Sequence, residues 1–564
     1  KGDLKFSKEG NSGMETPTFS NGAAYADLDG DGDLDLVVNN IDQLATIYRN
    51  DSDSSNFIKI DLIGNSENRS GIGAKVTVVC GDLIQTSEHY LARGFQSSMS
   101  DELHFGIGKI RIVDHIEVVW SDGTVSKISQ INPNKTVTIA QDKSLSQAQT
   151  TFRAKNSIET ELSTLEFTHR ENEFDDYARE VLLPHKMSNL GPAVGVGDAN
   201  GDGLDDFYVG GAAGKTGYLY IQTQSGEFDI SQERFFSQYA EREEVVAYFF
   251  DYDGDDDQDL YIGYGGNENL NGSENLADKL FMNDQGEFFE TDILPESLSI
   301  STGTVISADY DQDGDLDLFI GSRQTPGKYP FASSSYLLKF EAGRYVDVTA
   351  EIAPGLAEIG MVTDAVWADL NGDKIPELVL SGEWMPVTIF ELKGGYYINS
   401  TRSFGLDQTN GWWFSLEVGD IDNDGDLDLV AGNLGLNYKY KASLDGPFKV
   451  FSDDINDDGK NDIVLGYDEA GKTFPLRGRQ CSSEQIPELE LKFPTYDLFA
   501  IATISDVYGD RLEPSLKLEA YDFHSAVFIN EGGSFKQVNF AHRFQSFNWN
   551  DIILKDINAD GNLD

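Results

Sequence analysis

The chain has 564 residues, enough for two to four domains, and its 39% hydrophobic content with 56 glycines is typical of a folded, turn-rich protein. No apolar run approaches the roughly 20 residues of a membrane-spanning helix, so no transmembrane segment is expected in this fragment. The net charge of −55, from 97 acidic and 42 basic residues, argues against a nucleic-acid surface.

The first recognisable element is the acidic phrase 27-DLDGDGDLD-35, which we interpret as a calcium loop. Oxygen side chains stand at positions 1, 3, 5 and 9, and position 7 is expected to offer only its backbone carbonyl. Calcium takes six to eight such oxygens at about 2.3–2.6 Å, and glycine at position 6 supplies the positive φ of a tight turn. An EF-hand instead needs a glutamate at position 12 and flanking helices. Here a strand-like run, LDLVVNN, follows at once, so the loop is predicted to join two β-strands.

The same phrase occurs eight times, with starts at residues 27, 198, 251, 309, 369, 420, 454 and 556. Up to eight structural Ca²⁺ ions are therefore expected. The predicted ligands are Asp27, Asp29, Asp31, Asp33 and Asp35; Asp198, Asn200, Asp202, Leu204 and Asp206; Asp251, Asp253, Asp255, Asp257 and Asp259; Asp309, Asp311, Asp313, Asp315 and Asp317; Asp369, Asn371, Asp373 and Glu377; Asp420, Asp422, Asp424, Asp426 and Asp428; Asp454, Asn456, Asp458, Lys460 and Asp462; and Asp556, Asn558, Asp560, Asn562 and Asp564.

Between the first two loops, residues 57–141 have a different sequence pattern. Short alternating strands such as GAKVTVVCG and HIEVVWSDG predict a small β-sandwich or barrel, and eight Lys/Arg nearly balance nine Asp/Glu. Residues 142–161 are polar and suit a linker. The cysteines, Cys80 and Cys481, fall in different predicted domains, and two free thiols are the simpler reading, although a disulfide stays open.

From residue 198 to residue 420 the loops recur every 50–60 residues, which fits one four-stranded propeller blade per loop. Residues 162–564 are therefore predicted to form a β-propeller. The long interval after the loop at 454 holds an insertion near residues 475–509, which lacks strand alternation and is expected to be partly helical.

These motifs carry a family resemblance. The DxDGDGxxD loops resemble FG-GAP/VCBS repeats, which build calcium-binding β-propellers. The motifs 68-NRSGIGAKV-76, 94-GFQSS-98, 103-LHFGIG-108 and 120-WSDG-123 resemble the ASPIC/UnbV domain. The order of the parts is similar to cartilage acidic protein-like surface or secreted proteins of Bacteroidota. The resemblance implies an all-β protein in an extracellular or cell-surface location, either secreted or associated with an outer membrane.

By that resemblance, residues 1–50 are the terminal blade of an upstream propeller. The seven later loops imply a second propeller of about seven blades, the last of them truncated. A rival layout is one eight-bladed propeller in which residues 20–50 pair with residues near 550–564. Both chain ends are expected to be cuts through a longer protein.

Two loops depart from the pattern at position 6. Asp256 and Lys374 replace the glycine there, and a β-carbon at positive φ costs on the order of 1 kcal/mol. We expect the sites at 251 and 369 to bind calcium most weakly.

For function, the sequence favours a non-catalytic, calcium-stabilised recognition or adhesion module with an extracellular glycan or protein partner. Aromatic and amide side chains after the sixth loop are candidate ligand contacts, although aromatics near propeller strands are more often core. These residues are Trp412, Trp413, Asn433, Asn437 and Tyr438.

Two alternatives stay open. A polysaccharide-processing enzyme or accessory subunit would draw on His169, Arg170, Glu171, Asn172 and His185, but no catalytic motif is present and no catalytic residue is assigned. RNA binding through the ASPIC/UnbV domain is disfavoured, because that domain is near-neutral and lacks a basic stripe.

Overall fold

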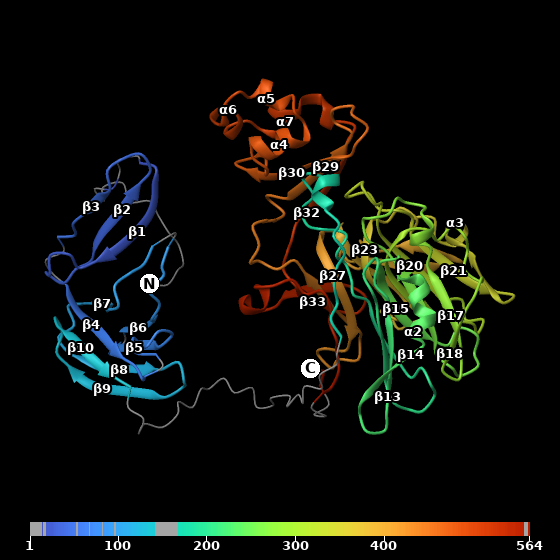
Figure 1. Cartoon of the computed structure of the whole chain (residues 1–564), viewed down its shortest axis with the longest axis horizontal. Helices are drawn as coiled ribbons and strands as arrows, with labels where there is room; N and C mark the ends of the chain where they lie inside the picture. Colours follow the sequence, from blue (N-terminus) through green and yellow to red (C-terminus); the bar gives the residue numbers. More distant parts are fainter. Residues whose placement is uncertain are drawn as a thin grey trace. The chain divides into compact units, whose positions relative to one another are not determined.

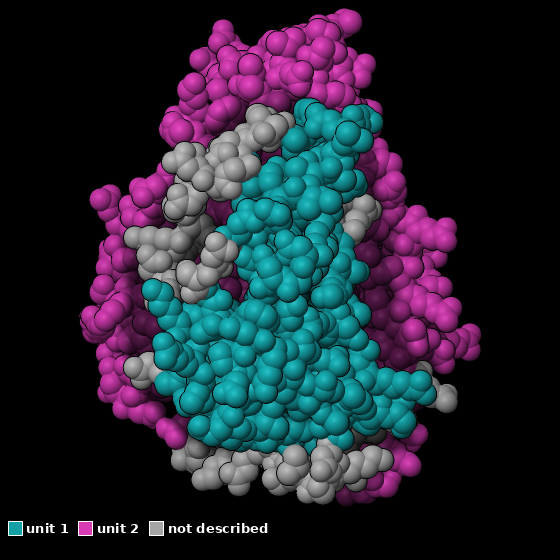
Figure 2. All heavy atoms as spheres, turned by 90° about the vertical axis from the view of Figure 1, so that its left-hand side faces the viewer, with its two compact units in different colours: residues 1–159 teal, residues 160–564 magenta. Residues whose placement is uncertain are grey.

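The computed structural model describes residues 14, 18–51, 55–66, 68–81, 83–94, 97–141, 167–557 and 562–563. The predicted linker at 142–161 and the ligands Asn558, Asp560 and Asp564 of the eighth loop lie outside these residues. The chain divides into two compact units, residues 1–159 and 160–564 (Figure 2). Among the described residues no helix has the length and apolarity to cross a membrane.

Unit 1 consists of three small sheets, as the short alternating strands predict. One has the order β1-β2-β3, a second β10-β4-β7, and a third β6-β5-β8-β9. The second and third sheets enclose one core, which contains Ile60, Val76, Ile116 and Trp120. The strands are β1 (Ser20–Ala26), β2 (Asp35–Asn40), β3 (Thr46–Tyr48), β4 (Asn56–Ile63), β5 (Lys75–Cys80), β6 (Leu83–Glu88), β7 (Leu103–Gly108), β8 (Val113–Val119), β9 (Val125–Ile131) and β10 (Thr136–Ala140).

Unit 2 contains five successive four-stranded antiparallel blades, which we number one to five (Figure 1), and pairing of β24 with β27 joins blades four and five into one eight-stranded sheet. Their innermost strands β11, β15, β19, β23 and β27 pack against one another in that order, which is the arrangement of a propeller. The prediction of an all-β, propeller-like fold is confirmed. The blades are β11 (Val194–Gly197), β12 (Asp206–Val209), β13 (Tyr218–Gln222) and β14 (Phe228–Ser231); β15 (Glu244–Phe250), β16 (Asp259–Tyr264), β17 (Lys279–Asp284) and β18 (Glu287–Glu290); β19 (Ser301–Ala308), β20 (Asp317–Gln324), β21 (Tyr336–Glu341) and β22 (Arg344–Asp347); β23 (Met361–Ala368), β24 (Glu377–Met385), β25 (Thr388–Lys393) and β26 (Tyr396–Asn399); and β27 (Gly411–Gly419), β28 (Asp428–Asn433), β33 (Ala526–Asn530) and β34 (Phe535–Asn539).

The loop at 454 does not begin a sixth blade, which corrects the expectation of one blade per loop. Its strands belong to a separate sheet, β31-β30-β29-β32, inserted between β28 and β33 of blade five (Figure 1). The insertion therefore spans residues 434–525 and exceeds the predicted 475–509. Its elements are β29 (Phe448–Asp453), β30 (Asp462–Glu469), β31 (Lys472–Pro475) and β32 (Leu516–Ala520), with α4 (Arg479–Gln485), α5 (Leu489–Lys492), α6 (Tyr496–Ala500) and α7 (Ile504–Tyr508).

The core of unit 2 extends from the blades into this insertion. Trp384 of β24 stacks on Phe448 of the inserted sheet with ring centroids 5.5 Å apart, and Trp412 of β27 contacts both. The segment before blade one, which includes α1 (Asp176–Arg179), adds Leu183 and Met187 to the same cluster. Both cysteines are free thiols; Cys80 is buried and Cys481 is exposed.

Candidate metal centres and ligand-binding residues

Seven of the eight acidic loops lie within the described residues, and each connects two antiparallel strands. In every case the residue before position 1 pairs with the residue at position 9, as in Ala26 with Asp35 and Gly419 with Asp428. The predicted strand–loop–strand arrangement is thus confirmed, and the helical EF-hand alternative is excluded for these loops.

The loop carboxylates organise the backbone of the turn. At position 1, Asp198 accepts hydrogen bonds from the amides of Asp202 (3.1 Å) and Gly203 (2.8 Å). At position 5, Asp202 accepts from the amide of Leu204 at 2.9 Å. The position-7 amide makes this same bond in all seven loops, so the varied side chain there is not needed for the fold.

The carboxylate at position 9 links the loop to the blade through hydrogen bonds. Asp428 is buried, and its two oxygens accept from the amides of Ile421 and Asn530, each at 2.8 Å. Those amides belong to the loop and to β33, so one carboxylate links three parts of the hairpin and sheet. Asp35, Asp206 and Asp259 make the equivalent pair of bonds.

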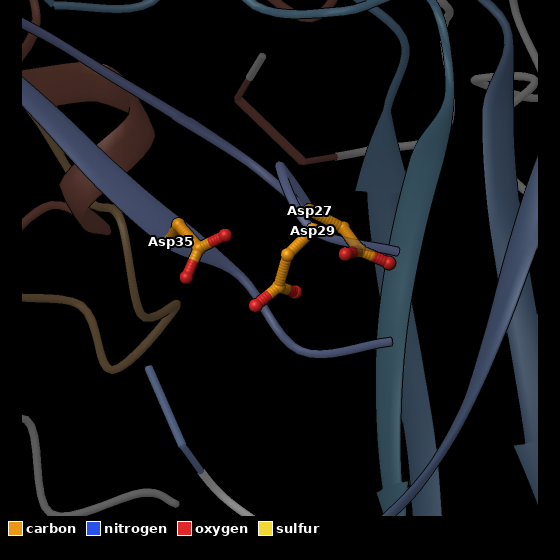
Figure 3. Close-up of side chains that lie close together, drawn as sticks. All are labelled: Asp27, Asp29 and Asp35. Atoms are coloured by element: carbon orange, nitrogen blue, oxygen red, sulfur yellow. The ribbon is translucent and has the colours of Figure 1, made fainter. Parts of the chain in front are cut away.

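Four loops bring three carboxylates close enough to share one ion. In each group one oxygen per residue lies within 4.8 Å of the others, about twice the Ca–O distance. Figure 3 shows the first group, in which the side chains come from the two ends of the loop. The groups are Asp27, Asp29 and Asp35; Asp251, Asp253 and Asp255; Asp309, Asp311 and Asp317; and Asp420, Asp422 and Asp428. The loops at 198, 369 and 454 carry asparagine at position 3, whose amide oxygen is also a calcium ligand type.

Burial perturbs the acids at position 9. It raises the pKa of Asp259, Asp317, Asp462 and Glu377 to about 7, and the neighbouring carboxylates add to the effect. A divalent cation would remove this cost by pairing with the ionised forms. The residues present therefore fit calcium.

Two loops already hold an ammonium group, which the sequence pattern did not indicate. Lys339 Nζ pairs with Asp311 and lies 2.9 Å from Asp313, and Lys59 Nζ lies 2.8 Å from Asp27. These lysines come from other strands, so only the folded structure brings them to the loops.

The two residues that replace glycine at position 6 adopt the same left-handed backbone conformation as the glycines. Asp256 and Lys374 both have φ of 72°, in the left-handed region that the other loops fill with glycine. Position 4 is also left-handed in all seven loops, with φ of 61° at Gln312 and 60° at Asn423, a requirement missed from the sequence. The run of Gly, Asn and Asp at position 4 carried that signal.

The five candidate ligand residues separate into two groups. Trp413 is fully buried with its indole N–H donating to Thr409 O, and the buried Asn433 spends its side chain on backbone groups. Neither lines the cavity to which Trp412 contributes. Trp412, Asn437 and Tyr438, by contrast, line one cavity.

The histidines proposed for the enzyme alternative have different partners. His169 Nε2 bonds Glu171 at 2.9 Å, whereas His185 Nε2 lies 2.9 Å from Glu383 of blade four. The structure therefore does not join the predicted polar segment into one site. Glu383 was not anticipated, because it is 198 residues from His185 in the chain.

The family described as ASPIC and UnbV matches residues 64–146, and the FG-GAP-like repeat matches residues 198–262 and 369–431. No curated sequence matches.

Two solved structures are similar in part. The Vibrio cholerae biofilm matrix protein Bap1 has a TM-score of 0.24 at 15% identity, over 49% of this chain and 37% of its own. The Dos1 propeller has a TM-score of 0.25 at 11% identity, over 68% of this chain and 85% of its own. At these scores neither structure informs fold or function.

The family matches coincide with loops described above. Residues 198–262 span the loops at 198 and 251, and residues 369–431 span those at 369 and 420. The chain thus contains an ASPIC/UnbV domain followed by FG-GAP-like repeats.

Proposed function

We propose that this chain is a non-catalytic recognition module of the cell exterior whose blades are held by calcium. The observation that carries the proposal is the repetition of one strand–loop–strand geometry in seven hairpins, four of which bring three carboxylates within 4.8 Å of one another. Calcium at these loops would be structural, because each loop fixes the connection between the first two strands of its sheet.

The extracellular location is supported by the calcium affinity that is typical of extracellular modules. Extracellular calcium modules bind at about 10⁻⁴–10⁻³ M, which suits fluids outside the cell and would leave the loops empty at cytosolic calcium levels. The net charge of −55 adds to this argument, since each bound ion relieves repulsion in the folded chain.

A binding role is supported by the scaffold. Five blades with ordered hairpins present their connecting loops on a rigid body, and such loops commonly carry recognition. The partner would be an extracellular glycan or a surface protein.

Calcium titration followed by thermal melting tests the structural role of the metal. We expect the melting temperature to rise with calcium and to fall again with EDTA. Indifference of the melting curve to both would sink the proposal.

A matched pair of variants tests the ligand assignment. Asp311→Ala removes the side-chain oxygen at position 3 of its loop and should remove about one calcium from the stoichiometry found by calorimetry. Asp315→Ala, at position 7 of the same loop, should leave the stoichiometry unchanged, because only the backbone is used there. Equal stoichiometries for both variants would contradict the assignment.

A further inference from the structure

A cavity of about 710 Å³ lies where the innermost strands of the propeller converge. Four consecutive blades each contribute a residue to its wall: Val245 of β15, Thr302 of β19, Thr363 of β23 and Phe414 of β27. Because these strands follow one another around the propeller, the cavity lies on its axis. Its size is that of a typical small-ligand site.

The charge of the wall opposes that of the protein. With 97 acidic residues among 564, about three acids are expected among nineteen lining residues. All nineteen are described, and they include no Asp or Glu, whereas His185, Lys186 and Arg323 are all present. This is the pattern of a site for an anionic group.

Two buried donors at this wall have no partner among the described residues. Arg323 is 5% exposed, and its Nη1 makes no hydrogen bond. Trp412 is 1% exposed, and its Nε1 is likewise unpaired. A buried donor without an acceptor is destabilising, so each of these groups calls for a water molecule or a ligand atom as its acceptor.

Arg323 is held in place by an ion pair with a buried carboxylate. Its Nη2 pairs with Glu383, which is buried and also lies 2.9 Å from His185 Nε2 and accepts from Tyr329 Oη at 2.9 Å. Burial alone would raise the pKa of Glu383, but Arg323 and His185 hold it below its usual range. One edge of the guanidinium is therefore anchored, while the buried Nη1 has no hydrogen-bond partner in the fold.

The rest of the wall mixes polar and apolar side chains, and two of its aromatic rings are exposed. Four asparagines line it, and Tyr438 and Phe547 are 37% and 55% exposed. Amide groups match the hydroxyls of a sugar, and exposed rings offer a face for a pyranose. The asparagines are Asn189, Asn437, Asn548 and Asn550.

We propose that the axial cavity binds a uronic-acid unit of an acidic glycan. Its carboxylate would meet Arg323 and Trp412, its hydroxyls the asparagine amides, and its ring the exposed aromatic face. The inference rests on the proposed function in taking the chain as a binding module, and it names the ligand class and the site.

Calorimetry with calcium-saturated protein and trigalacturonic acid tests the proposal. We expect binding to the free acid, and at least tenfold weaker binding to its methyl ester and to neutral maltotriose. Equal affinity for acid and ester would overturn the role of the carboxylate. Equal affinity for acetate and trigalacturonate would overturn the role of the sugar.

Variants locate the site. Arg323→Lys keeps the charge but loses the fork, and should weaken binding at least tenfold. Because a disturbed pair with buried Glu383 can unfold the protein, Asn437→Ala and Tyr438→Ala provide a second test at the accessible wall. Each should weaken binding severalfold with an unchanged melting temperature. Tyr396→Ala on β26, also an exposed tyrosine, is the control and should bind like the parent.

The outcomes separate this inference from the proposed function. Calcium-dependent melting without uronate binding would overturn the cavity proposal and leave the calcium proposal standing. Uronate binding that survives EDTA, in a protein that calcium does not stabilise, would overturn the calcium proposal and leave the cavity proposal standing. Cleavage of the trisaccharide would support the site and overturn its non-catalytic character.

Discussion

Single residues decide how well each loop can close. Positions 4 and 6 are left-handed in all seven loops that the structure describes, so both favour residues that tolerate positive φ. Where position 6 holds Lys374 or Asp256, the fold keeps the conformation and carries the strain, because the surrounding hairpin fixes both ends of the loop.

The strain at Lys374 predicts a stabilising substitution. Lys374→Gly should raise the free energy of unfolding by about 1 kcal/mol, since glycine adopts φ of 72° without cost. It should also strengthen calcium binding at this loop, because a positive charge is removed. Urea unfolding in EDTA measures the first effect, and calorimetry measures the second.

The reverse change at a regular loop is the control. Gly459 has φ of 83° and no atom within 4 Å of an added β-carbon, so Gly459→Ala tests the backbone alone. It should cost about 1 kcal/mol. No change in either variant would mean that position 6 is not strained.

Lys339 is predicted to compete with calcium. Its ammonium group pairs with Asp311 and Asp313, which are positions 3 and 5 of the loop at 309. Lys339→Met should therefore raise the affinity of that loop severalfold, in line with about 0.5–1 kcal/mol for a partly exposed ion pair. Terbium luminescence or calorimetry would detect the change.

A lysine outside the loops serves as the comparison. Lys127 pairs with Glu117, which is not a predicted ligand. Lys127→Met should leave calcium affinity unaltered, and an equal gain in both variants would point to net charge rather than local competition.

At the scale of elements, the position-9 carboxylate joins strands that are distant in sequence. Asp428→Ala would leave the amides of Ile421 and Asn530 without their acceptor and should cost about 2–4 kcal/mol in the absence of calcium. Exposed Asp426, two residues earlier, is the matched site, and Asp426→Ala should cost less than about 0.5 kcal/mol. Chemical unfolding in EDTA compares the two, and similar losses would refute the tie between loop and blade.

The hairpins could be predicted from local sequence patterns, whereas pairing between distant strands could not. Each hairpin was predictable because its loop and strands lie within about twenty residues. The inserted sheet was not, because Ala431 of β28 pairs with Ala526 of β33 across the whole insertion. The long interval after the loop at 454 indicated an insertion, and the interval from 420 to 454, shorter than a blade repeat, was a further sign that the insertion begins before this loop.

The ligand candidates follow the same rule. Trp412 and Trp413 are adjacent on β27, so their side chains lie on opposite faces of the blade. One lines the cavity and the other packs between β27 and β33, which strand alternation alone could have indicated. Arg323 and Glu383 come from blades three and four, and nothing in the sequence joined them.

At the scale of the whole molecule, buried acids away from the loops shape stability against pH. Glu244, the first residue of β15 in blade two, is buried against blade one, where Gly211 N–H and Tyr208 Oη donate to it. Arg242 is the nearby cation. Burial raises its pKa from 4.5 to about 8, and raises that of the adjacent Glu243 to about 8 as well.

The sign of the pH dependence follows from proton binding. Between pH 4.5 and 8 the folded protein keeps the Glu244 proton that the unfolded chain has released. The free energy of unfolding therefore falls as the pH rises through this window, by up to about 1.4 kcal/mol per pH unit for each such group.

The Glu244→Gln variant tests this pH dependence. Its amide is a neutral acceptor that does not titrate, so the variant should lose the part of the slope that Glu244 contributes. Urea unfolding at several pH values, with saturating calcium so that the loops stay filled, measures it. Exposed Glu287 is the control, and Glu287→Gln should follow the parent curve. Parallel curves for the parent and Glu244→Gln would show that Glu244 is ionised in the fold, because its proton would then make no difference between the two states.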